Sequence, residues 1–151
     1  MWSSMTAAYE SLSESMKNFL KNLTAEHDFC HGFKESIAEP GGRERLKDAI
    51  KNNPPVIHPV IRTHPITKRK AIFVNPLFTT KINELSKSES DALLEFLYSY
   101  SITPEFTCRF SWTPNSIAIW DNRCTLHKPI NDYFPEHRLL ERITVDGDEP
   151  F

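Results

Sequence analysis

The sequence is poor in the residues that mark several common protein classes. It has three cysteines and four glycines in 151 residues, and no apolar run approaches the length of a membrane span. The cysteines are odd in number and show no paired spacing, which argues against a disulfide framework and fits a reducing compartment. The N-terminus lacks the basic-then-apolar pattern of a secretory signal. We therefore expect a cytoplasmic protein that does not bind a membrane.

Excess charge of one sign is also missing. The formal net charge is −2, which excludes nucleic-acid binding through bulk charge. Hydrophobic residues make up 39% of the chain, enough for a single core at this length. The composition predicts one domain, or part of one.

Hydrophobic spacing predicts a mixture of helices and strands. Apolar residues at helical spacing predict a helix over 2–23, and a charged segment predicts a short surface helix over 43–53. Ser86 and Glu89 form the pattern of a capping box and predict the start of a third helix. Runs rich in β-formers predict a hairpin and three further strands: 56–63 paired with 71–75, then 106–112, 116–120 and 138–145. The expected fold is α+β or mainly β.

The strongest chemical signal lies in the last third of the chain. The predicted strand 116–120 ends at a turn that places His127 just beyond it. Residues two apart on the predicted strand 138–145 share a face, so Arg138 and Arg142 point the same way, roughly 13 Å apart at about 3.3 Å per residue. One histidine with two aligned arginines suggests a metal site that takes anionic ligands. The alternative is a structural histidine with two solvated arginines.

Four other histidines have weaker patterns. His27 and His31 lie four residues apart, a spacing that can bind zinc on a helix, but no further ligand cluster lies near them in the sequence. His58 and His64 each precede a proline, and their simplest role is as polar groups near strand ends. None of the four is our choice for a metal ligand.

The stretch Trp120-Asp-Asn-Arg-x-Thr-x-His127, followed after ten intervening residues by Arg138, resembles the C-terminal signature of the taurine dioxygenase (TauD/TfdA) family. That family contains iron(II)- and 2-oxoglutarate-dependent oxygenases. Further motifs resemble the same family in the same order along nearly the whole chain: His58-Pro-Val-Ile-Arg-Thr-His-Pro65, Phe73-Val-Asn75, Phe78-Thr-Thr80, Pro104-Glu-Phe106 and Gly147-Asp-x-Pro150.

The resemblance implies a role for each candidate site residue. His127 would be the distal histidine ligand of Fe(II), and Arg138 would hold the C5 carboxylate of the cosubstrate 2-oxoglutarate. Arg142 would meet the anionic head of a small sulfonate or carboxylate substrate. Phe33 and Phe78 would line the substrate pocket, although the sequence alone would place Phe33 in the core.

The resemblance also implies a fold, a double-stranded β-helix (jelly roll) with flanking helices, in which residues 1–151 form the C-terminal portion of a single domain. The family's first two iron ligands come from a His-x-Asp or His-x-Glu motif, and the sequence contains neither. The triad therefore cannot be completed from these residues, and we expect a barrel that is incomplete on its N-terminal side.

Two functions stay open at this stage. The first is a dioxygenase that hydroxylates the carbon next to an anionic group with O2, releasing succinate and CO2. The second is a catalytically inactive, truncated barrel that serves as a binding or oligomer-interaction module. Unpaired strand edges would favour a homo-oligomer in either case.

Overall fold

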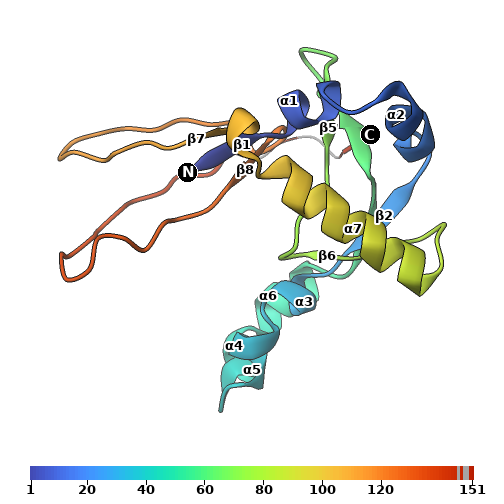
Figure 1. The fold of residues 1–151 in the computed structure, drawn as a ribbon. Coiled ribbons are helices and arrows are strands. Elements are labelled where there is room, and N and C mark those ends of the chain that lie inside the picture. Colours follow the sequence, from blue (N-terminus) through green and yellow to red (C-terminus); the bar gives the residue numbers. More distant parts are fainter. Residues whose placement is uncertain (146, 148–149) are drawn as a thin grey trace.

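The computed structural model describes residues 1–145, 147 and 150–151 of the chain (Figure 1). The helices are α1 (Met5–Glu10), α2 (Glu14–Leu20), α3 (Phe29–Gly32), α4 (Lys34–Ala38), α5 (Gly42–Arg45), α6 (Lys47–Asn52), α7 (Lys87–Ser101) and the 3-10 helix η1 (Pro104–Phe106). The strands are β1 (Trp2–Ser4), β2 (Thr24–His27), β3 (Val56–Pro59), β4 (Ile61–Thr63), β5 (Lys70–Ile72), β6 (Thr79–Ile82), β7 (Thr107–Cys108) and β8 (Thr125–His127).

The hydrophobic core forms where helices α1 and α7 meet the small sheets. Helix α1 packs on β5, and α7 packs on β6. The long helix turns Leu93, Leu94 and Leu97 inward, which is the spacing of one helical face. Every buried apolar side chain among the described residues lies between Met5 and Leu97. The core therefore belongs to the first two thirds of the chain.

Three sheets surround this core without closing into a barrel. One has the order β7-β1-β8, a second the order β3-β2-β6, and the third is the hairpin β4-β5; all of these pairings are antiparallel. The predicted hairpin is confirmed in β4 and β5, where Ile61 lies opposite Ile72 and Thr63 opposite Lys70. The first half of the predicted strand 56–63 is instead β3, which pairs with β2.

Local capping fixes the helix starts and corrects one prediction. The capping box at α7 is confirmed, because the backbone N–H of Ser86 donates to Oε2 of Glu89 at 2.9 Å. The single helix predicted over 2–23 is wrong. Ser4 and Ser13 each accept a hydrogen bond from a backbone N–H three residues later, and each starts a separate helix behind strand β1.

Helices α3 to α6 form an arm that extends away from the core (Figure 1). The predicted surface helix at 43–53 corresponds to α5 and α6 within this arm. His27 lies on β2 and His31 on α3, so the two do not share a helical face. The zinc-binding spacing that their sequence positions suggested is therefore absent.

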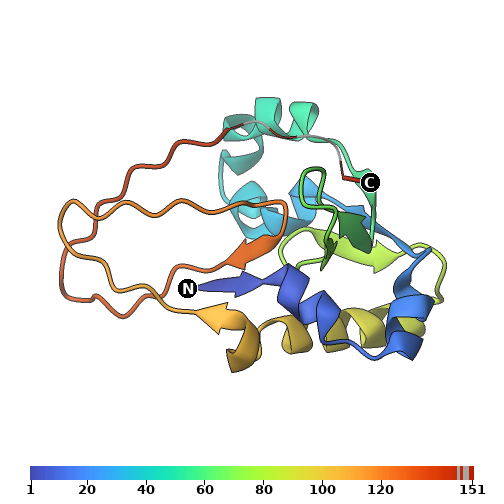
Figure 2. The same cartoon turned by 90° about the horizontal axis from the view of Figure 1, so that it is seen from above.

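The segments 109–124 and 128–145 form two long extended ribbons that leave the sheet β7-β1-β8 on the same side (Figures 1 and 2). The predicted strand 106–112 is reduced to Thr107–Cys108, and the predicted strands 116–120 and 138–145 are wrong, because no strand is assigned to these described residues. An extended segment becomes a strand only when a neighbouring strand pairs with its backbone groups. Residues 138–145 are all exposed, and Ile117 and Ile119 of the predicted buried strand are also exposed, so neither segment forms the predicted strand face.

Candidate functional site

His127 is the last residue of β8 and lies directly opposite Trp2 of β1. Its ring centroid is 5.1 Å from that of Trp120, the residue that opens the same motif. Partial burial lowers the pKa of His127, and the positive charges of Arg142 and the N-terminal ammonium lower it further. The neutral imidazole, which is the form that binds a metal, is therefore favoured.

The two arginines of the predicted site lie in different surroundings. The charge of Arg142 contributes to the lowered pKa of His127, although fifteen positions separate the two residues in the sequence. The guanidinium carbon of Arg138 instead lies 5.5 Å from the ring centroid of Tyr133 in its own ribbon. Both arginines are exposed, and their predicted common strand face is not formed.

An aromatic cluster covers one side of this site. The Trp2 ring has its centroid 5.3 Å from that of Trp120 and 6.4 Å from those of both Phe110 and Trp112. Sequence reasoning missed Trp2, because it placed this residue in a helix. The β-type alternation of Phe110 and Trp112 was a usable signal for the other half of the cluster.

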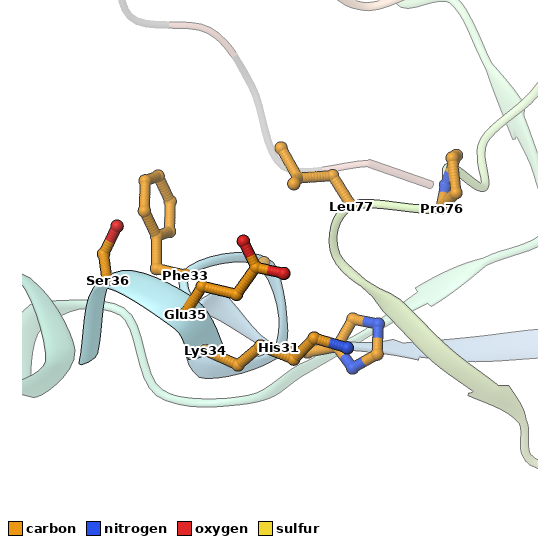
Figure 3. A pocket seen from close by; sticks show the side chains of 8 residues that line it. His31, Phe33, Lys34, Glu35, Ser36, Pro76 and Leu77 are labelled. Atoms are coloured by element: carbon orange, nitrogen blue, oxygen red, sulfur yellow. The ribbon is translucent and has the colours of Figure 1, made fainter. Parts of the chain in front are cut away.

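Phe33 and Phe78 lie close together, but only Phe33 is among the residues that line the cavity beside them. Their ring centroids are 6.1 Å apart, and Phe33 stacks on Phe29 at 4.5 Å. A cavity of about 280 Å³ lies against Phe33, lined by residues 31–36 together with Pro76 and Leu77 (Figure 3). A Cβ at Gly32 would lie 2.8 Å from the Phe78 ring, so glycine permits this close approach.

One group of three potential metal ligands gathers in the part of the chain that the structure describes. The ligand atoms of His64, Asp121 and Cys124 lie within 4.8 Å of one another. Nε2 of His64 is 3.0 Å from Oδ2 of Asp121, and Nη2 of Arg123 donates to the same oxygen at 2.7 Å. These contacts already occupy the lone pairs that a cation would need, so the group is better described as a hydrogen-bonded clamp.

The described residues do not supply a full ligand set for iron. The family resemblance implies two histidines and a carboxylate, and the one gathered group of potential ligands among the described residues does not include His127. The residue that the resemblance offers as an iron ligand among those described is His127. Of the closing motif Gly147-Asp-x-Pro150, Asp148 lies outside the described residues.

Comparison with known proteins decides the family. The family model described as "Taurine catabolism dioxygenase TauD, TfdA family" matches residues 1–144. The chain belongs to this family. The resemblance proposed from the sequence motifs is thereby confirmed.

Three relatives of the TauD/TfdA family show the extent of the match. The alpha-ketoglutarate-dependent sulfonate dioxygenase of Saccharomyces cerevisiae is 36% identical over 147 residues, which cover 95% of this chain and 34% of the relative. The alkylsulfatase of Acinetobacter baylyi is 35% identical over 150 residues, which cover 97% of this chain and 47% of the relative. The crystal structure of a taurine dioxygenase from Burkholderia xenovorans matches with a TM-score of 0.65 and 33% identity, over 82% of this chain and 38% of that chain.

The chain thus spans about a third to a half of the length of the curated relatives it matches. Its fold is that of TauD-type dioxygenases, which are jelly rolls, with helices and sheets mixed and the sheets not closed among the described residues. None of the helices within the described ranges is long and apolar enough to cross a membrane.

Proposed function

We propose that this chain provides part of the active site of an iron(II)- and 2-oxoglutarate-dependent dioxygenase that acts on a small anionic sulfonate or sulfate ester. The observation that supports the proposal is the match of the family model to residues 1–144, with His127, Arg138 and Arg142 at the motif positions. The charge of Arg142 also lowers the pKa of His127, as expected for an anion-binding group in its neighbourhood. Two relatives, the sulfonate dioxygenase of Saccharomyces cerevisiae and an alpha-ketoglutarate-dependent sulfate ester dioxygenase of Pseudomonas putida, support the same substrate class.

The family resemblance implies each proposed role, and the chemistry of each side chain suits it. His127 offers a neutral imidazole, one of the nitrogen ligands that suit ferrous iron. Arg142 offers positive charge beside it, which would attract the anionic head of the primary substrate. Arg138 offers a planar fork that can bind the C5 carboxylate of 2-oxoglutarate through two parallel hydrogen bonds. Phe33 and Phe78 would form an apolar wall for the remainder of the substrate.

A non-catalytic binding module is the less favoured function. The relatives reported above are named as enzymes, and the match covers nearly the whole of this chain.

The experiment that tests the proposal compares two arginine variants in an assembled enzyme, in which a segment bearing the His-x-Asp pair precedes this chain. Arg138→Lys replaces the fork with a single point donor. It should weaken 2-oxoglutarate binding with every substrate by about 1.5–3 kcal/mol, roughly tenfold or more.

Arg142→Lys should act on the primary substrate instead. It should raise the Michaelis constant for the sulfonate and leave the slow decarboxylation of 2-oxoglutarate without substrate largely intact. If both variants affect 2-oxoglutarate and sulfonate alike, or if neither affects anything, the assignment of roles is wrong.

A further inference from the structure

The turn that leads into β8 is fixed by its own carboxylate. Oδ1 of Asp121 accepts hydrogen bonds from the backbone N–H and from Nε of Arg123, both at 2.9 Å. Nη2 of Arg123 donates to Oδ2 at 2.7 Å. The guanidinium of Arg123, followed by His64, holds the pKa of the Asp121 carboxyl well below its usual range. Asp121 is therefore a charged acceptor that stabilises the turn.

His64 connects this turn to the core, and its hydrogen bonds define its tautomer. Nδ1 of His64 accepts from the backbone N–H groups of Ile66 at 3.3 Å and Thr67 at 3.2 Å. Because Nδ1 accepts, the proton of the neutral ring is on Nε2, which donates to Oδ2 of Asp121 at 3.0 Å. A histidine with both nitrogens engaged and with a buried side chain has a fixed orientation.

The turn that carries His64 is itself anchored. The backbone N–H of His64 donates to the carbonyl of Arg69 at 2.8 Å, and its carbonyl accepts from the N–H of Lys68 at 2.9 Å. The preceding strand β4 is packed in the core through Ile61. His64 is therefore a buried link between the core hairpin and the segment that leads to His127.

The strand that carries His127 is attached through its backbone to β1 and through Leu126, which packs against the core. It pairs with β1 on one side, where the N–H of Met5 donates to the carbonyl of Cys124 and the N–H of Lys128 to that of Met1, both at 3.0 Å. It is an edge strand of its sheet within the described residues. The ribbons before and after it are largely exposed.

We propose that His64 and Asp121 form a positioning clamp that sets the placement of β8 and thereby of the His127 ring. The clamp fixes the turn that precedes β8, and β1 pairs with the backbone of β8. His64 acts through Asp121 and is a positioning residue. The inference rests on the proposed role of His127, but the clamp itself can be tested without iron or 2-oxoglutarate.

The test uses the isotope-labelled 151-residue chain and four variants. His64→Leu removes the donor to Asp121, and Asp121→Asn removes the charged acceptor with little change of shape. His64→Gln keeps an N–H donor at about the reach of Nε2. Glu10→Gln is the matched control, because Glu10 forms an ion pair with Arg69 of the same turn at 2.8 Å but does not contact Asp121.

Two signals report on the strand, and a third reports on the core. Hydrogen exchange of the Met5 and Lys128 amides measures the β1–β8 pairing, and that of Phe73, which donates to the Val60 carbonyl at 2.7 Å, measures the core hairpin. The ring-proton shifts of His127 measure its distance from the Trp120 ring.

His64→Leu and Asp121→Asn should speed exchange at Met5 and Lys128 by about tenfold or more relative to Phe73, since a charged hydrogen bond is lost. The His127 ring signals should move with them. His64→Gln keeps a donor to Asp121, so its amide exchange and His127 ring signals should stay close to those of the parent protein. Glu10→Gln should change neither the exchange nor the ring signals.

Unchanged β8 exchange and His127 shifts in both His64→Leu and Asp121→Asn would overturn the proposal. Equal acceleration at Phe73 would also overturn it, because His64 would then support the whole fold rather than position His127. The exchange experiment contains no metal, so either result is independent of whether the proposed dioxygenase function is correct.

Discussion

The first two thirds of this chain and its two C-terminal ribbons differ in how far they bury their apolar side chains. Between Met5 and Leu97, the leucines and valines of the core lie under helices α1 and α7. In the two ribbons most of the aliphatic side chains are exposed, from 46% at Leu140 to 94% at Ile119. Both regions contain segments rich in β-favouring residues. The difference is therefore whether a neighbouring strand or helix covers each segment.

This difference in burial bears on the position of the candidate site. His127 lies at the border, on a strand that β1 pairs from the core side and that continues into an exposed ribbon. Arg138 and Arg142 lie wholly in the ribbon. The metal-ligand candidate is thus held by the folded core, and the residues proposed to bind anions depend on how the ribbon is covered.

The largest expected effect comes from truncating one leucine in each region. Leu97→Ala removes a fully buried side chain and should lower the free energy of unfolding by about 4 kcal/mol. Leu139→Ala, at a position that is 79% exposed, should change it by less than about 0.5 kcal/mol. Urea denaturation of both variants measures this, and an equal loss in the two would show that the ribbon is packed as tightly as the core.

The second effect concerns acid sensitivity of the core. Burial, with His58 nearby, lowers the pKa of His27 to about 4 from an ordinary value near 6.5. As the pH falls below 6.5, the unfolded chain takes up a proton that the folded chain refuses until about pH 4. Stability should therefore fall through this window, by roughly 3 kcal/mol at pH 4.

His27→Gln should remove this part of the pH dependence, whereas His137→Gln in the exposed ribbon should leave it in place. Thermal melts of the three proteins between pH 7 and pH 4 provide the measurement. A parent protein with the same slope as His27→Gln would contradict the assignment to His27.

The third effect concerns self-association through the ribbons. Exposed aliphatic faces of this kind promote pairing between copies, so we expect the isolated chain to associate. Ile143→Glu should raise the dissociation constant about tenfold, because burying an isoleucine contributes roughly 1.5–3 kcal/mol. Ile66→Glu is the matched control, an isoleucine 74% exposed in the core hairpin turn. If sedimentation shows the same change in the dissociation constant for both variants, the ribbon is not part of the interface.

Local chemistry made the core predictable from the sequence. The capping pattern of Ser86 and Glu89 and the turn between β4 and β5 are decided within a few residues, and both predictions were confirmed. The helix predicted over 2–23 failed because Trp2 pairs with residues more than a hundred positions away. Such long-range pairing overrides the helical spacing of the segment.

The roles of the candidate site residues stay a prediction of the family motif, and their arrangement was not predictable. The motif suggested His127, Arg142, Phe33 and Phe78, and of these the Phe33 and Phe78 rings lie 6.1 Å apart in the structure. The common face of Arg138 and Arg142 assumed a strand, which requires a neighbouring strand that the described residues do not provide. The link from His64 to Asp121 spans fifty-seven positions and has no periodic signal in the sequence.

The most direct test of the central claim is iron-dependent succinate release from 2-oxoglutarate. It would be measured for the 151-residue chain alone, for a fusion in which a relative's segment with the His-x-Asp pair precedes Met1, and for the same fusion with His127→Ala. We predict no succinate from the chain alone, since one imidazole cannot replace a three-ligand site, clear turnover by the fusion, and a loss of about a hundredfold or more in His127→Ala. Iron-dependent succinate from the chain alone, or a His127→Ala fusion as active as its parent, would contradict the claim.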